Sequence, residues 1–237
     1  MPSIFQLAIP VARAIEKWKS LAPTVPVPTV MAIAHKESTF NPQAKNPNST
    51  ALGPFQVLAG SLAQYGLTSP DQRTDVDRVT KGAVMVFAKA AADVDKVFPG
   101  LNPAERSGWI YLAHWQGPGA LRTALALVKQ KGLTPTVESA AKVLDGLQLK
   151  GAKRPLKVPV GPMADVRRYY KIWDQARADL GGDWSGLVAW GESPRGSQTV
   201  LASRGSRRKP TTGGGGGGGV LVFGLLGLGL LAALAKH

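Results

Sequence analysis

The segment Val30-Met31-Ala32-Ile33-Ala34-His35-Lys36-Glu37-Ser38-Thr39-Phe40-Asn41-Pro42 carries the strongest signals in the chain. Its first half predicts a short apolar helix that begins near Pro28, because proline fits the first turn of a helix. After Ser38 the sequence is rich in Asn-Pro and Gly-Pro turn signals. Glu37 therefore lies where an apolar helix meets a loop, at the mouth of a predicted cleft. A carboxyl group against apolar side chains suits a general acid at neutral pH.

Outward from this helix, the chain up to residue 180 shows further helical spacing. Apolar residues over 75–97 recur every three or four positions, which is typical of an amphipathic helix. No segment alternates with a period of two for long enough to indicate a β-sheet. We therefore expect an all-α domain. Further helices are predicted over residues 103–115, 119–131, 137–149 and 164–180.

The composition narrows the possible chemistry. The chain has 237 residues, 29 Lys and Arg against 15 Asp and Glu, and a formal net charge of +14. It has no Cys, which excludes a disulfide scaffold, a cysteine nucleophile and a zinc site built on thiolates. Three histidines leave little room for a His-based metal site, so we expect no metal and no cofactor. The positive charge predicts polyanionic surroundings, such as nucleic acid, anionic lipid or an acidic cell-wall polymer.

Four short motifs follow one another between residues 37 and 117. They are Glu37-Ser38, Phe40-Asn41-Pro42-Gln43-Ala44, Ala51-Leu52-Gly53-Pro54-Phe55-Gln56 and Ala113-His114-Trp115-Gln116-Gly117. In this order and spacing they resemble the signatures of the soluble-type lytic transglycosylases, whose fold is like that of goose lysozyme. The resemblance implies a lysozyme-like helical domain over residues 1–180. The ending Gly117-Pro118-Gly119-Ala120 is most similar to transglycosylases carried in bacteriophage virions.

The resemblance also implies a reaction and a set of site residues. The family cleaves the β-1,4 bond between N-acetylmuramic acid and N-acetylglucosamine in peptidoglycan strands without water and leaves a 1,6-anhydro ring. Glu37 matches its single catalytic glutamate, and His114 takes the place of its tyrosine near that carboxyl. The substrate-binding positions carried over from the family are Ser38, Asn46, Phe55, Gln56, His114 and Gln116.

The distribution of acidic residues favours the same chemistry independently. Ordinary glycosidases need two carboxyl groups across the scissile bond. There is no acidic residue between Glu37 and Asp71. A second carboxyl group from Asp71, Asp75 or Asp77 could still fold back toward Glu37.

The C-terminal region differs in character from the helical domain. Residues 181–219 are rich in Gly, Ser, Arg and Pro and predict a flexible, basic linker. Residues 220–235 are apolar and predict a C-terminal transmembrane helix of about 24 Å, somewhat short of the roughly 30 Å of a bilayer core. The alternative is a helix buried in the domain core. The basic cluster from Arg204 to Lys209 favours contact with lipid headgroups over specific binding of nucleic acid.

Together these features predict a membrane-associated lytic transglycosylase that opens peptidoglycan locally. The first charged residue is Arg13, so the N-terminus lacks the basic region of a secretory signal. With the phage-like motif, this suggests a virion protein that acts in the host cell envelope, beside other virion or ejection proteins, and helps delivery of the genome. A late lysis role, a hydrolytic muramidase or endolysin on the same fold, and a structural ejection protein with a degenerate enzyme domain remain open.

Overall fold

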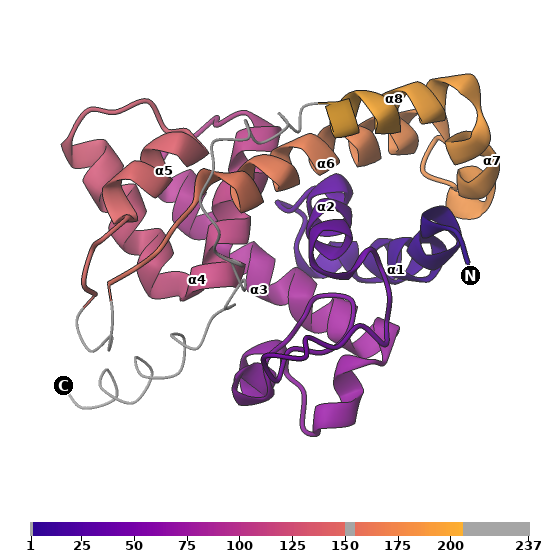
Figure 1. Ribbon diagram of the computed structural model, residues 1–237, viewed down its shortest axis with the longest axis horizontal. Helices are drawn as coiled ribbons and strands as arrows, with labels where there is room; N and C mark the ends of the chain where they lie inside the picture. The colour runs from indigo at the N-terminus through magenta and orange to yellow at the C-terminus, as the bar shows by residue number, and fades with distance from the viewer. Residues whose placement is uncertain (1, 150–154, 206–237) are drawn as a thin grey trace, which may run out of the picture.

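The computed structural model describes residues 2–149 and 155–205, which are mostly helical (Figure 1). These residues contain no β-strand, only isolated bridges that join Leu52 to Lys45 and to Val57. The all-α prediction is therefore confirmed for the described part of the chain. In chain order the elements are α1 (Ile4–Trp18), η1 (Lys19–Leu21), α2 (Val27–Ser38), η2 (Ala59–Tyr65), η3 (Pro70–Arg73), α3 (Val76–Val97), α4 (Pro103–Gln130), α5 (Val137–Leu144), α6 (Val160–Asp179), η4 (Trp184–Gly186), α7 (Leu187–Glu192) and α8 (Pro194–Gly205).

Helix α2 lies inside the domain. Every residue from Val27 to Ala34 is buried, and α1, α3, α4 and α6 all contact this helix. A helix that is apolar on all sides is stable only when other helices enclose it. Thr29 is the one polar residue among these buried positions, and its hydroxyl shares a hydrogen bond of 2.8 Å with the Ser107 hydroxyl of α4. Only the last turn of α2, which carries Glu37, reaches the partly exposed surface.

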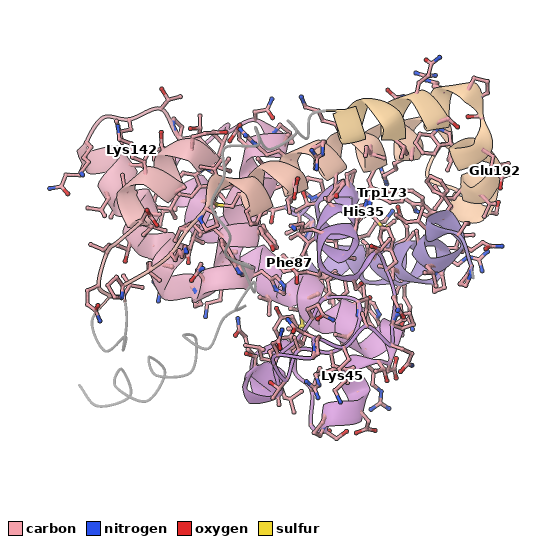
Figure 2. The ribbon with its side chains drawn as sticks, viewed as in Figure 1. His35, Lys45, Phe87, Lys142, Trp173 and Glu192 are labelled. Carbon is pink, nitrogen blue, oxygen red and sulfur yellow. The ribbon has the colours of Figure 1, made fainter. Side chains whose placement is uncertain are left out.

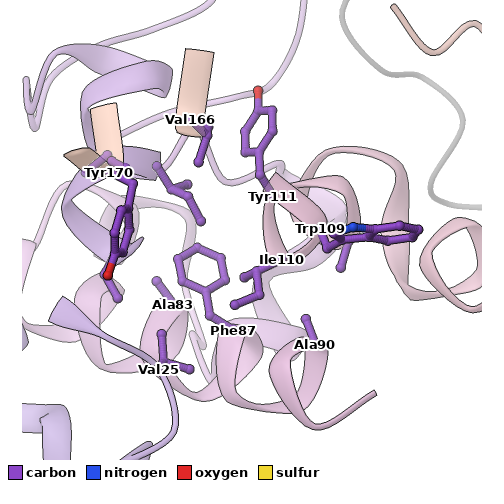
Figure 3. Packing of buried hydrophobic residues seen from close by; sticks show 14 of the residues in the cluster. Val25, Ala83, Phe87, Ala90, Trp109, Ile110, Tyr111, Val166 and Tyr170 are labelled. Atoms are coloured by element: carbon purple, nitrogen blue, oxygen red, sulfur yellow. The ribbon is translucent and has the colours of Figure 1, made fainter. Parts of the chain in front are cut away.

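Helices α3 and α4 pack beside α2 and follow the predicted ranges closely. Asp75 caps α3, because its side chain accepts a hydrogen bond of 3.1 Å from the amide of Arg78. The two helices predicted over 103–115 and 119–131 are the two halves of α4, which breaks at Gly117 (φ 85°, ψ 164°). Tyr111, in the first half, is fully buried in the cluster that also holds Phe87 (Figure 3).

The ends of α5 and α6 differ from the predicted ones. Helix α5 ends at Leu144, well before the predicted residue 149. Helix α6 begins at Val160 rather than 164, and it includes Pro162 in its first turn, where proline is tolerated.

The expected linker over residues 181–219 is wrong for the part that the structure describes. Residues 184–205 form η4, α7 and α8, and α8 lies alongside α6 (Figure 1). The apolar side chains of Trp184, Leu187 and Trp190 are buried. The Gly, Ser and Pro content indicated a solvated segment, but these three side chains bury enough apolar surface to hold it on the domain. Ordered packing therefore continues beyond residue 180.

The predicted transmembrane helix over 220–235 lies outside the described residues, as do residues 206–219 of the predicted linker. Within 2–149 and 155–205, no helix is long and apolar enough to cross a bilayer.

Candidate active site

Glu37 is paired with a buried tyrosine from another helix. The hydroxyl of Tyr111, on α4, donates a hydrogen bond of 2.6 Å to Oε1 of Glu37, on the last turn of α2. Tyr111 has no exposed surface, whereas Glu37 is partly exposed. One carboxylate oxygen is thus held from inside the protein while the side chain still reaches solvent.

The backbone directly after Glu37 reverses direction sharply. Thr39 and Phe40 both have positive φ, 55° and 64°, a region that residues other than glycine rarely adopt. The Phe40 ring is fully buried and packs edge-to-face on Trp173 of α6, with ring centroids 4.9 Å apart. Burial of this ring offsets the backbone strain and fixes the end of α2 beside the loop that follows.

The loop over residues 44–57 lies against this helix end. Ser38 Oγ donates to the carbonyl of Pro54 at 2.9 Å, and it also lies 3.3 Å from the carbonyl of Ala34. Gly53, at φ 84°, passes so close to the chain that a Cβ there would lie 1.9 Å from the carbonyl oxygen of Arg73. A glycine is therefore required at this point of the loop.

Gln56 and Arg73 stabilise the same loop with their side chains. Gln56, at φ 48°, donates from Nε2 to the carbonyls of Ala44 (2.8 Å) and Gly53 (3.0 Å). The buried guanidinium of Arg73 donates to the carbonyls of Thr50 and Val57, as well as to that of Pro70. Because the loop has almost no regular structure, these side chains supply the hydrogen bonds that a sheet would otherwise provide.

His114 connects the loop to Tyr65. The Tyr65 hydroxyl lies 2.7 Å from Nδ1 of His114, within hydrogen-bond distance. The backbone of Phe55, in the loop, also acts on the His114 ring and favours its charged form. His114 is thus placed between Tyr65 and the loop.

Burial sets the protonation of this group of side chains. It raises the pKa of the Tyr65 and Tyr111 hydroxyls well above the usual value, and the negative charge of Glu37 raises both further. Burial lowers the pKa of His114, against the opposing effects of Glu37 and the Phe55 backbone. At neutral pH the two tyrosines therefore stay protonated and His114 stays uncharged.

The carboxylates that were candidates for a second catalytic group are engaged elsewhere. Asp75 pairs with Arg78 at 3.3 Å and caps α3. Asp77 accepts from Lys17 at 2.9 Å and from the Trp18 indole at 3.0 Å. Hydrogen bonds with the side chain of Ser69 and with the backbone lower the pKa of the Asp71 carboxyl.

A further carboxylate, not anticipated from the sequence, comes from α6. The negative charge of Asp165 contributes to the raised pKa of the Tyr111 hydroxyl. Asp165 is itself in ion pairs, with Lys36 at 3.5 Å and with Arg168. A carboxylate neutralised by two cations is poorly suited to activate a water molecule.

Of the predicted site residues, Glu37, Ser38 and His114 come together where the end of α2, the loop and α4 meet. Gln56 lies in the same loop, where its Nε2 is bound to two backbone carbonyls. Asn46 shapes the loop, accepting from the amide of Asn48 at 2.9 Å, and Gln116 is partly exposed just before the break in α4.

Phe55 is the one predicted substrate contact that the structure corrects. Its ring has no exposed surface and packs on Phe87 at 6.1 Å, because the loop turns it toward α3. The ring of Phe55 therefore belongs to the core rather than to the surface near Glu37.

Sequence reasoning missed Tyr111, Tyr65 and Arg73. A signal was present for Tyr111, which precedes His114 by one helical turn and so lies on the same side of α4. Tyr65 and Arg73 lie in short 3-10 helices without any periodic pattern, and no comparable signal pointed to them.

Comparison with known families agrees with this geometry. The family model "Transglycosylase SLT domain" matches residues 14–135, which is more than half of the chain and includes Glu37, Tyr111 and His114. The chain belongs to the transglycosylase SLT domain family. Among curated proteins, none matches the sequence.

The members of this family are lytic transglycosylases that act on peptidoglycan, and these enzymes are lyases. The protein is therefore a peptidoglycan lytic transglycosylase with a lysozyme-like helical fold. Its helix α6 lies outside the matched residues and still packs against α2.

Proposed function

We propose that Glu37 is the catalytic residue and acts first as a general acid and then as a general base. The observation that carries this proposal is the 2.6 Å hydrogen bond from the Tyr111 hydroxyl to Glu37 Oε1. Because Oε1 accepts this bond, Oε2 is the oxygen that delivers and receives the proton. The buried Tyr111 thereby orients the carboxyl group toward the glycan.

The proposed reaction consumes no water. Glu37 protonates the glycosidic oxygen between N-acetylmuramic acid and N-acetylglucosamine, and the bond from that oxygen to C1 of the muramic acid breaks. The N-acetylglucosamine leaves with the proton as a hydroxyl group. The Glu37 carboxylate then accepts the proton of the muramyl C6 hydroxyl while O6 bonds to C1. The product carries a 1,6-anhydro ring, and Glu37 regains its proton.

The carboxylate arrangement supports this route over hydrolysis. A hydrolase needs a second free carboxylate, which acts either as the nucleophile or as the base that activates a water molecule. Asp75, Asp77 and Asp165 are each bound to cationic side chains. We infer that none of them acts as the second catalytic group.

We further propose that Ser38, Gln56 and His114 form the wall of the cleft near Glu37. Nε2 of Gln56 donates hydrogen bonds to two backbone carbonyls, so Oε1 is the atom left to accept a hydrogen bond from a sugar hydroxyl. Asn46 and Gln116, which are partly exposed, are proposed to contact the glycan further along.

For the biological setting, we propose an enzyme of the soluble-type subfamily that belongs to a phage virion and opens the host cell wall during delivery of the genome. The sequence Gly117-Pro118-Gly119-Ala120 and the apolar residues 220–235 support this setting. Residues 220–235 would anchor the enzyme to a membrane. Immunodetection of the protein in purified particles, and its release from membranes after deletion of 213–237, test the two parts separately.

The catalytic proposal is tested by mass spectrometry of muropeptides released from purified peptidoglycan. The native chain should give 1,6-anhydromuropeptides, and Glu37→Gln should give none while keeping its circular-dichroism spectrum. Mainly reducing muramic-acid ends would instead establish a hydrolytic muramidase or endolysin. Substantial activity of a folded Glu37→Gln variant would remove Glu37 from the mechanism.

A further inference from the structure

The outer face of α3 carries a continuous row of exposed residues. They follow one another at intervals of three or four positions and are Arg78, Lys81, Met85, Lys89, Ala92 and Lys96. At about 100° per residue, this spacing keeps all six within an arc of about 80° around the helix. We call this row the α3 ridge. It contains four cations and no acidic residue.

The end of α1 extends the α3 ridge with an aromatic and an aliphatic side chain. The ammonium groups of Lys17 and Lys81 each lie 4.6 Å from the centroid of the Trp18 ring, so Trp18 lies directly beside the ridge. Leu21 follows one turn later in η1, which contacts α3. Among the described residues, Leu21 (47%) and Met85 (55%) are the large hydrophobic side chains with the greatest exposure.

The neighbouring acidic residues leave most of the positive charge of the ridge unneutralised. On the flanks of α3, Asp77 pairs with Lys17 and Asp95 with Arg106, and Asp75 pairs with Arg78 of the ridge itself. Asp93 lies at the edge of the row. Within the described part of the chain, no ion pair involves Lys81, Lys89 or Lys96.

The ridge and the candidate active site lie on opposite faces of α3. Phe87, labelled in Figure 2, lies on the inward face of α3. Its ring packs against His114 at 5.6 Å and against Phe55 at 6.1 Å. Two residues correspond to about 200° of rotation, so Met85 points almost directly away from these side chains. A large surface bound at the ridge would leave Glu37 and its loop accessible from the other side.

We propose that the α3 ridge, with Trp18 and Leu21, is a contact surface for a membrane rich in anionic phospholipid. Lysines at a membrane surface reach phosphate groups while their methylene stems and neighbouring apolar side chains enter the headgroup region. The mixture of free ammonium groups with exposed Met85 and Leu21 fits such a boundary. A soluble polyanion would complement the charge but would leave the two apolar side chains in water.

This inference goes beyond the proposed function. It gives the catalytic domain a membrane contact of its own, independent of residues 220–235, and orients the active site away from the lipid. It also does not depend on the identity of the catalytic residue.

The absence of cysteine from the chain allows a direct test with the full-length protein. The Met85→Cys variant, labelled with the polarity-sensitive fluorophore nitrobenzoxadiazole, is titrated with phosphatidylcholine vesicles that contain or lack phosphatidylglycerol. We expect a blue shift and brighter emission only with phosphatidylglycerol. The same label at Ala178→Cys, an exposed uncharged position on α6, should show no change. Adding Lys81→Glu and Lys89→Glu should weaken the Met85 response by at least about tenfold, since each cation near an anionic surface contributes measurably.

Two results would overturn the proposal. In the first, the chain sediments with anionic vesicles while the Met85 label does not respond, which would place the lipid contact elsewhere, for example in residues 220–235. In the second, DNA or polyphosphate binds through Lys81 and Lys89 whereas vesicles leave the label unchanged, which would identify a soluble polyanion as the partner. Unchanged cleavage of purified peptidoglycan by the Lys81→Glu, Lys89→Glu variant establishes that it is folded.

Discussion

The rings of Phe40 and Trp173 meet edge-to-face with centroids 4.9 Å apart, although 133 positions separate them in the chain. Phe40 belongs to the strained turn directly after Glu37, and Trp173 to α6, outside the residues that match the family. Trp173 also contacts Phe5, which in turn packs on Trp190 of α7. The C-terminal helices thus support the turn after Glu37 through a series of aromatic contacts.

Removing these helices should destabilise the domain. A chain that ends at residue 180 should unfold at a lower temperature than one that ends at residue 205, by several degrees, because loss of Trp190 and Leu187 exposes Phe5 and neighbouring apolar surface. Both chains lack residues 206–237, so the comparison isolates η4, α7 and α8. Equal melting temperatures in differential scanning calorimetry would mean that these helices do not stabilise the domain.

Tyr111→Phe should lower the rate of peptidoglycan cleavage by about ten- to a hundredfold. The change removes the hydroxyl that positions Glu37 Oε1 but keeps the buried ring, so the fold should remain intact. The rate is measured from turbidity loss of purified peptidoglycan at saturating substrate. Tyr170→Phe, which alters a buried tyrosine of α6, is the matched control and should retain full activity. Equal rates for the two variants would show that the Tyr111 hydroxyl does not assist Glu37.

His114 should make the domain sensitive to mildly acidic pH. Burial holds the pKa of His114 below its unfolded value of about 6.5, so the unfolded chain takes up a proton at His114 before the folded chain does. The stability that His114 contributes is therefore complete above about pH 6.5 and is lost as the pH falls through the folded pKa. His114→Gln keeps a donor and an acceptor without this titration, and its melting temperature should fall less than that of the native chain between pH 7 and pH 5. Parallel curves would contradict the lowered pKa of His114.

Arg73→Met should impair both stability and activity. The guanidinium donates hydrogen bonds to the carbonyls of Thr50, Val57 and Pro70. Its removal leaves these carbonyls without a donor, which should lower the free energy of unfolding by about 1–3 kcal/mol. The loop that carries Gln56 should then be held less firmly, which should reduce cleavage. Urea unfolding and the turbidity assay check the two effects. Arg122→Met, at an exposed position on α4, should change neither.

The sequence by itself determined the helical class and the position of Glu37. Apolar spacing every three or four residues, Asp75 as an N-cap and Gly117-Pro118 as a break act over one or two turns, so the segments around them contain the whole signal. The same holds for Glu37, because the apolar run before it and the turn residues after it already place a carboxyl group at a helix end.

Only the tertiary structure decided which side chains complete the site. The pairing of Tyr111 with Glu37 joins positions 74 residues apart, and that of Tyr65 with His114 joins positions 49 apart. The inward turn of the Phe55 ring and the docking of α7 and α8 likewise follow from burying apolar surface against distant helices. Local propensity cannot encode these arrangements. The free energy that favours them comes from burial of apolar surface in contacts that exist only once the helices have packed.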